Sequence, residues 1–206
     1  MGYNRGGRGG TLTDILDQTD YSREQFVDVD WAGQVIAGVE FESCQFRGSN
    51  LAKVSFSKCR FLDCKFEHCD MGLMKVVNTR FRDTSFKECK LIGVNWTPVS
   101  AAVGLSFESC LLNYSIFSGL DLRRMALVRS SARETDLSDC NLEGAVLTGT
   151  DFLGARFSST NLRKADLRGA ANYQIDPSSN KIGKAKVSLP EAISLLRGLD
   201  VIIEDA

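Results

Sequence analysis

Seven cysteines and one histidine are the side chains of this 206-residue chain best suited to nucleophilic or metal-binding chemistry. A Cys/His or Ser/His pair needs a buried, oriented base, and His68 lies at a position of the sequence pattern that is expected to face solvent. The cysteines all recur at one position of the same pattern, and ligands that repeat in a line cannot surround a metal ion tetrahedrally. They are Cys44, Cys59, Cys64, Cys69, Cys89, Cys110 and Cys140. With no Gly-rich phosphate loop either, the sequence predicts no catalytic residues, no metal site and no cofactor.

The spacing of the cysteines belongs to a five-residue period that runs through most of the chain. Every fifth residue from Tyr21 to Trp96 is apolar or aromatic, and the series resumes one residue out of phase from Phe107 to Leu167. All twelve phenylalanines occupy this position, which we call the pentad centre. A period of five fits neither a helix nor a flat strand, so the chain must turn a corner after each pentad to keep the centres facing one core.

Two further positions of the pentad are restricted. The residue two before the centre is Ala, Cys, Ser, Thr or Val in 23 of 29 pentads, and all seven cysteines fall there. We expect buried free thiols, because cysteines at this inward-facing position behave as small hydrophobic residues and a reducing setting is expected. Glycine recurs two residues after the centre, as at Gly33 and Gly149, which is typical of a corner.

The pattern of a small residue, Asn or Asp, Leu or Phe and two free residues resembles the pentapeptide-repeat family over residues 16–173. The resemblance implies an all-β fold, a right-handed quadrilateral β-helix with four pentads per coil, in which residues twenty apart stack. About seven and a half coils at ~4.8 Å would give a rod about 36 Å long. The residues of one expected aromatic ladder are Phe26, Phe46, Phe66 and Phe86, and those of a second are Phe41, Phe61 and Phe81.

The three prolines lie only where the period is interrupted, because proline inside a coil would remove a ladder hydrogen bond. Trp96 and Phe107 are eleven residues apart, which fits either one residue bulging from the wall or a loop projecting toward a partner. The domain prediction treats 97–106 as a loop that interrupts the β-helix, and both alternatives remain open. Residues 1–15 are expected to be a flexible leader.

Residues 174–206 are expected to form a capping and dimerisation module with a short helix and a short strand. The run from Ser188 to Glu191 is typical of a capping box before a helix. The open end of a β-helix must be covered, and the same apolar residues could join two copies. The resemblance implies a homodimer, and a monomeric cap is the alternative. The predicted dimer-interface residues are Leu195, Leu196, Leu199, Val201, Ile202 and Ile203.

The net charge of −1 hides three segments of opposite sign. Residues 11–46 carry a net −7, residues 47–133 a net +7 and residues 134–151 a net −5. Such runs are usually solvated faces, although stacked coils could align them into patches that attract an oppositely charged partner. Direct nucleic-acid binding through the basic middle is the least favoured function. The sequence contains neither a signal peptide nor a membrane span, so a cytoplasmic protein is expected.

Within the family, the chain looks most similar to bacterial proteins that protect DNA gyrase and topoisomerase IV from poisons, of the albicidin-immunity, quinolone-resistance and microcin B17 immunity types. The stretches that carry this resemblance are CKLIGVNW at 89–96, LSFESCLLNYSIF at 105–117 and KVSLPEAISLLRGLDVII at 186–203. It implies a non-enzymatic DNA mimic that binds the A subunit of gyrase and protects it from albicidin or a fluoroquinolone.

A full DNA mimic would be acidic along its length, whereas this chain is acidic only in patches. We therefore expect a partial mimic that makes contact through the 97–106 segment and one acidic band. The alternative is a β-helix scaffold that binds another protein. The residues expected to contact the topoisomerase are Asp28, Asp30, Glu40, Glu42, Pro98, Val99, Ser100, Val103 and Gly104.

Overall fold

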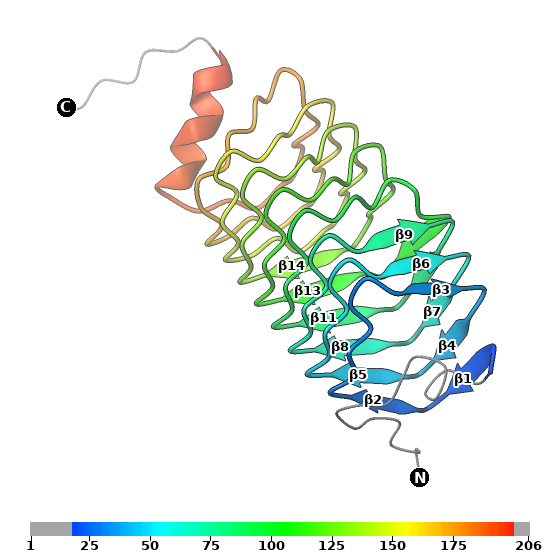
Figure 1. The fold of residues 1–206 in the computed structure, drawn as a ribbon. Helices are drawn as coiled ribbons and strands as arrows, with labels where there is room; N and C mark the ends of the chain where they lie inside the picture. The colour runs from blue at the N-terminus through cyan, green and yellow to red at the C-terminus, as the bar shows by residue number, and fades with distance from the viewer. Residues whose placement is uncertain (1–17, 200–206) are drawn as a thin grey trace.

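The computed structural model describes residues 18–199, which form one rod of stacked coils (Figure 1). Each coil contains four pentads, and residues about twenty apart lie side by side in parallel pairs. Tyr21 pairs with Phe41 on one side of the rod, and Phe26 pairs with Phe46 on the next. The predicted right-handed quadrilateral β-helix is confirmed.

The four sides of the rod, here called walls 1 to 4 in chain order, consist of short parallel strands or single β-bridges. Wall 1 contains β1 (Asp20–Ser22), β4 (Glu40–Glu42), β7 (Arg60–Leu62), β10 (Arg80–Arg82) and β12 (Ala101–Val103). Wall 2 contains β2 (Gln25–Val27), β5 (Gln45–Arg47), β8 (Lys65–Glu67), β11 (Ser85–Lys87), β13 (Ser106–Glu108) and β14 (Ala126–Val128). Wall 3 is paired at Asp30, Asn50, Asp70, Lys90, Leu111, Ser131, Asp151 and Ala171. Wall 4 contains β3 (Val35–Ala37), β6 (Ser55–Ser57) and β9 (Lys75–Val77).

The pentad positions behave as the sequence predicts. Centres such as Phe56 and Leu147 are completely buried. The residue two before the centre also faces the core, and Thr79 there donates its hydroxyl hydrogen to the carbonyl oxygen of Phe56, at an oxygen–oxygen distance of 3.0 Å. The residue two after the centre has a left-handed backbone, with φ of 68° at Gly33 and 54° at His68. Glycine is therefore favoured at these corners but is not required.

Aromatic rings form two ladders in the N-terminal half of the core. The ring of Phe66 stacks between Phe46 and Phe86, at centroid distances of 4.6 and 5.0 Å. Phe61 occupies the same place in the second ladder, with its neighbours at 5.0 and 5.1 Å. Both predicted ladders are confirmed, and each stacked pair contributes about 0.5–1.5 kcal/mol beyond the burial of its area.

All seven cysteines are buried and free, as predicted. Their thiols point along the core toward the coil before, and Sγ of Cys64 lies 3.2 Å from the carbonyl oxygen of Phe41. A hydrogen bond with the thiol of Cys44, together with burial, raises the pKa of Cys64. A raised pKa keeps the thiol protonated and poorly nucleophilic.

The interruption at 97–106 is a one-residue bulge in wall 1. The amide of Ser100 donates to the carbonyl oxygen of Thr79 at 2.9 Å, which is the bond made elsewhere by the residue before each centre. Ala101 then pairs with Arg80, so two residues of this coil lie opposite one residue of the coil before it. The wall resumes at once as β12. The prediction of a loop interrupting the β-helix is therefore wrong, and the wall bulge is the alternative that the structure shows.

The coils continue past residue 173, which the sequence predicted as the end of the β-helix. Lys181 still pairs with Asn161 of the coil before it, and wall 2 continues in the same way to Lys186. The predicted boundary is too early because Asn172, at the position of a pentad centre, is polar and ends the apolar series in the sequence. In the structure Asn172 is exposed, and Tyr173 is buried in the core in its place.

A 3₁₀ helix, η1 (Glu191–Leu199), follows the last coil and lies at the C-terminal end of the rod (Figure 1). Ser188 and Glu191 do not form the predicted capping box, because the helix begins at Glu191 and the Ser188 hydroxyl accepts a hydrogen bond from the amide of Gly169 at 2.9 Å. The expected leader at 1–15 and the expected strand at 201–203 lie outside the described residues.

Candidate interaction surface

Two of the acids expected to contact a partner lie on wall 1, near the N-terminal end of the rod. Glu40 and Glu42 flank the buried ring of Phe41 in β4, so both side chains point away from the core. Asp20 pairs with Glu40 in register, which brings a third acid to the same place. The guanidinium of Arg60 donates a hydrogen bond to Glu40 and partly offsets this charge.

The other two predicted acids lie elsewhere. Asp28 is the corner residue after β2, and its carboxylate extends over Gly48 in the next coil, where an added Cβ would lie 2.5 Å from Oδ1. Asp30 belongs to wall 3, where its Oδ1 accepts a hydrogen bond from the amide of Ala32 at 3.2 Å. The four predicted acids share one end of the rod, but they do not form one patch.

The predicted contact residues between 98 and 104 are part of the rod. The carbonyl oxygen of Pro98 accepts a hydrogen bond from the amide of Asn78 at 2.8 Å, and that of Val103 accepts one from Asp83 at 2.9 Å. Val99 is half-buried against the core, whereas Ser100 and Val103 are exposed. This segment is therefore a fixed surface.

Gly104 closes the segment at a corner that only glycine fits well. Its φ is 66°, and a Cβ at this position would collide with the side chain of Asp83. Val103 and Gly104 lie on the same wall as Glu40 and Glu42, three coils further along, which is about 14 Å. Wall 1 is thus the one surface that contains residues both from the predicted acids and from the predicted contact segment at 98–104.

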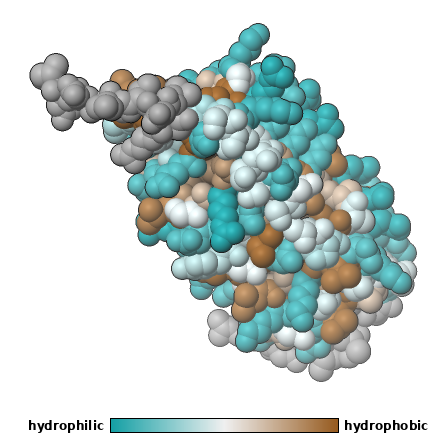
Figure 2. Space-filling model, turned by 90° about the horizontal axis from the view of Figure 1, so that it is seen from above, coloured by the Kyte–Doolittle hydropathy of each residue, from teal (hydrophilic) through white to brown (hydrophobic). Residues whose placement is uncertain are grey.

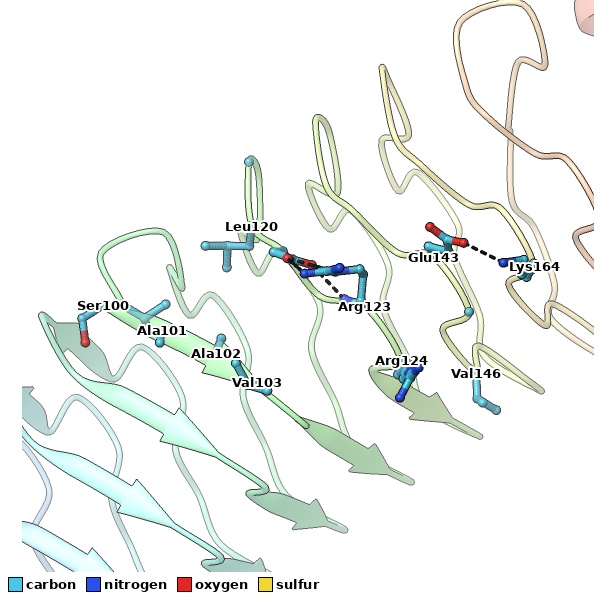
Figure 3. A pocket seen from close by; sticks show the side chains of 14 residues that line it. Ser100, Ala101, Ala102, Val103, Leu120, Arg123, Arg124, Glu143, Val146 and Lys164 are labelled. Atoms are coloured by element: carbon cyan, nitrogen blue, oxygen red, sulfur yellow. Dashed lines mark hydrogen bonds and ion pairs between the residues drawn. The ribbon is translucent and has the colours of Figure 1, made fainter.

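Wall 1 is hollowed at the bulge into a groove of about 980 Å³ (Figure 3). Ala101 and Ala102 line it, at positions where the coil before carries the much larger Arg80 and Phe81. Further apolar side chains that line the groove are Val99, Val103, Leu120 and Val146. The groove exists because the coil that contains the extra residue also has the smallest side chains of the wall.

Two ion pairs line the C-terminal side of the groove. Arg123 binds Asp121 through two N–H groups, with Nη2–Oδ2 at 2.7 Å and Nε–Oδ1 at 2.9 Å. The ammonium of Lys164 lies 3.0 Å from Oε1 of Glu143 (Figure 3). Hydrogen bonds from Arg123 and Lys164 lower the pKa values of Asp121 and Glu143, respectively. Arg124 also lines the groove and has no ion pair within the described part of the chain.

Sequence reasoning missed the basic residues of this groove. Arg123 and Arg124 are twenty residues after Val103 and Gly104, and Lys164 is forty residues after Arg124. Residues twenty apart lie on the same wall after the bulge. Counting in steps of twenty from Val103 and Gly104 would therefore have placed all three basic residues on wall 1.

The acidic segment at 134–151 does not form a continuous negative band. Asp136 pairs in register with Arg156, and the guanidinium of Arg133 lies 2.7 Å from Asp151. Glu143 is paired with Lys164. The stacking of coils therefore mixes charges that the linear sequence separates.

The predicted dimer residues divide into two groups at the C-terminal end. Leu195 packs against the core of the rod, which is the behaviour of a cap. Leu196 and its neighbour Ile193 are each 41% exposed and present an apolar surface to solvent. The side chain of Leu199 and the whole of Val201–Ile203 lie outside the described residues.

Apolar side chains elsewhere on the surface are dispersed. Val35 on wall 4 and Leu153 on wall 3 are 67% and 48% exposed. The face drawn in Figure 2 shows hydrophobic residues scattered among hydrophilic ones rather than gathered into one broad area. The groove on wall 1 is therefore the better candidate for a specific contact.

Groups suited to acid–base or metal chemistry do not converge in the described part of the chain. His68 is an exposed corner residue whose Nδ1 lies 3.2 Å from Oε2 of Glu88. Residues 18–199 contain no cluster of three or more His, Cys, Asp or Glu that could hold a metal ion. Over the same residues, no helix has the length and apolar character needed to cross a membrane.

Comparison with known proteins identifies the repeat. A model of the pentapeptide repeat region matches residues 39–115, and a model of eight pentapeptide repeats matches residues 135–170. Together the two models cover more than half of the chain. A search of curated proteins finds no match.

A solved structure shares the fold. A trypsin-treated variant of QnrB1, described as a plasmid-mediated fluoroquinolone resistance protein, matches with a TM-score of 0.60 and 18% identity, over 90% of this chain and 100% of that chain. HetL from the cyanobacterium Nostoc sp., a pentapeptide repeat protein involved in heterocyst differentiation regulation, matches with a TM-score of 0.36 and 17% identity, over 81% and 86% of the two chains. With its five-residue period, its four-walled coils and two matching family models, this chain belongs to the pentapeptide repeat family.

Proposed function

We propose that this protein binds bacterial DNA gyrase as a partial DNA mimic and protects it from a topoisomerase poison such as albicidin or a fluoroquinolone. Topoisomerase IV is a second target of the same kind, and the outcome for the cell is resistance or self-immunity. The observation that carries the proposal is the fold shared with QnrB1 over 90% of the chain, since QnrB1 is described as a fluoroquinolone resistance protein.

The surface supports a contact through wall 1 at the N-terminal end rather than along the whole rod. Asp20, Glu40 and Glu42 lie together there, and their charge is complementary to a basic DNA-binding surface such as that of the gyrase A subunit. In the proposed contact, Asp28 and Asp30 extend the acidic surface around the same end. The segment from Pro98 to Gly104 adds a fixed apolar contact three coils away.

The proposed action is binding without chemistry. A parallel β-helix holds each side chain at a fixed distance from its neighbours, so the rod can present a surface without the cost of ordering flexible loops. The proposed partners place the protein in the cytoplasm. A homodimer through Leu195, Leu196, Leu199 and Val201–Ile203 belongs to the same proposal, and the exposure of Leu196 supports it.

A supercoiling assay with purified gyrase and a fluoroquinolone or albicidin tests this function. We expect added protein to restore supercoiling, and neutralisation of wall 1 by Glu40→Gln with Glu42→Gln to weaken the rescue. Asp136→Asn with Asp139→Asn on wall 4 is the matched control and should rescue as well as the wild type. Absence of rescue by the wild type across a wide titration would contradict the proposal.

The alternative is a non-enzymatic scaffold that binds another protein through the same wall. The two functions separate by affinity capture from a bacterial lysate, because only the first predicts recovery of gyrase subunits.

A further inference from the structure

We propose that the C-terminal half of wall 1 binds an extended acidic segment of a partner protein, with one large apolar side chain of that segment seated in the groove at the bulge. This half of wall 1 has a positive net charge, whereas the N-terminal end of the same wall is acidic. The proposed contact does not depend on gyrase being the partner, so it can hold or fail independently of the proposed function.

The apolar part of the site is the groove at Ala101–Val103. Val103 is 59% exposed. The equivalent residue in the preceding coil is Arg82, so the fold does not require an apolar side chain at this position. Leu120 is only partly buried where it packs against the core, and Val146 is 39% exposed. A side chain such as Leu or Phe that filled the groove would remove this apolar surface from water.

The charged part of the site begins where the apolar part ends. Across the four coils that follow the bulge, wall 1 has six bases against two acids, a net charge of +4. The acids, Asp121 and Glu143, are already held in ion pairs by Arg123 and Lys164. The four bases with no ion pair within the described residues are Arg124, Arg163, Lys181 and Lys184.

The geometry favours a segment that runs along the rod axis. Arg124, Lys164 and Lys184 occupy the same pentad position, at spacings of two coils and one coil. The distance from Val103 to Lys184 is four coils, or about 19 Å, which an extended peptide covers with about six residues. One apolar residue followed by acids over that length matches the order of groups on the wall.

The backbone of the wall limits how a partner can bind. Its amides and carbonyls are already used between coils, as in the bond from the amide of Asn141 to the carbonyl oxygen of Leu120 at 3.0 Å, so a partner cannot add a strand to this face. Recognition must come from side chains.

Nucleic acid fits the wall less well than an acidic peptide does. Single strands bind by stacking bases on aromatic side chains, and none of the residues that line the groove is aromatic. Asp121 and Glu143 would also lie against phosphates, whereas a peptide can space its acids to avoid them. The apolar groove has no use in binding a phosphate backbone.

Fluorescence anisotropy with synthetic peptides tests this proposal on the full chain. The probes are ten-residue peptides of Glu and Ser in which one Leu is moved through the positions, the same peptides with Ala for Leu or Gln for Glu, and an oligo-dT of equal length. We expect the best Leu peptide to bind about fivefold more tightly than its Ala form, and the Gln form to bind weakly.

Variants locate the site. Val103→Glu places a like charge in the groove and should weaken binding about tenfold, and Arg124→Gln should weaken it severalfold. The matched controls are Val35→Glu on wall 4 and Arg47→Gln on wall 2, both exposed, and neither should change the affinity. Circular dichroism of each variant checks that the rod remains folded.

Three results would overturn the proposal: no acidic peptide binds at millimolar protein, the Leu and Ala peptides bind equally, or Val103→Glu has no more effect than Val35→Glu. Tighter binding of oligo-dT that is lost in Arg124→Gln would assign the wall to nucleic acid instead.

Discussion

Deletion of Ser100 tests whether the interruption is one extra residue in a continuous wall. Ser100 is exposed, and the hydrogen bond from its amide to Thr79 can pass to the amide of Ala101 once Ser100 is absent. The number of wall hydrogen bonds is then unchanged, and one residue fewer must be ordered, which is worth about 1 kcal/mol. We expect the deletion to leave the free energy of unfolding unchanged or to raise it by about 1 kcal/mol, which corresponds to about 2–4 °C in Tm.

The matched control is deletion of Lys58, a corner residue in a regular pentad. Loss of this residue shifts the following pentads by one position, which directs Arg60 toward the core and Phe61 toward solvent. Exposure of the Phe61 ring, which is fully buried, costs about 2–3 kcal/mol, and burial of an unpaired charge costs several more.

Thermal unfolding followed by far-UV circular dichroism measures both deletions. We expect a cooperative transition at or slightly above the wild-type Tm for the Ser100 deletion, and a large loss of Tm or of folded protein for the Lys58 deletion. If the Ser100 deletion is as damaging as the Lys58 deletion, the register described for wall 1 is incorrect.

Three further predictions follow from the core and the surface. Phe66→Ala should destabilise the rod by about 3–5 kcal/mol in chemical denaturation, and Phe66→Leu by clearly less, because the ring is buried between two stacked neighbours; equal effects would argue against the ladder. A thiol reagent such as Ellman's should label no cysteine in the native protein and all seven after denaturation, and rapid native labelling would contradict their burial. Hydrogen bonds from Arg168 lower the pKa of Asp166 from its usual 3.8, so this pair contributes stability above that pH and loses it as the pH falls through the lowered value. Arg168→Gln should therefore reduce Tm at neutral pH and converge with the wild type in acid, and a constant difference at all pH values would refute the pairing.

The sequence was sufficient to predict the cross-section of the rod. A centre every five residues requires a corner after each pentad, and the resemblance to pentapeptide repeats implies four pentads per coil. From these two together follow the stacking of Phe46, Phe66 and Phe86, the burial of every cysteine and the left-handed corners. These features are determined locally, because each pentad repeats the same contacts with the coils on either side.

The sequence was less informative where one pentad departs from the pattern. Asn172 occupies a centre without being apolar, so the last coil was missed although its register is kept through Lys181. The bulge and the loop alternatives at 97–106 have the same residue count, and the structure distinguishes them by the hydrogen bond from Ser100 to Thr79 and the pairing of Ala101 with Arg80.

Charge was the least predictable feature. Segments of net −7, +7 and −5 suggest separate patches, yet stacking places Arg60 beside Glu40 and Arg156 beside Asp136. Which charges become neighbours depends on a spacing of twenty residues, not on proximity along the chain. The groove on wall 1 depends on the same spacing, since its basic residues come from coils distant in sequence from the bulge.

Binding of the purified protein to an immobilised gyrase A subunit, measured with and without competing duplex DNA, tests directly whether the protein binds gyrase as a partial DNA mimic. We expect binding that DNA displaces, a loss of about tenfold in affinity for Glu40→Gln with Glu42→Gln, and no loss for Asp136→Asn with Asp139→Asn. Absence of binding, or binding that neither DNA nor the wall 1 substitutions affect, would contradict it.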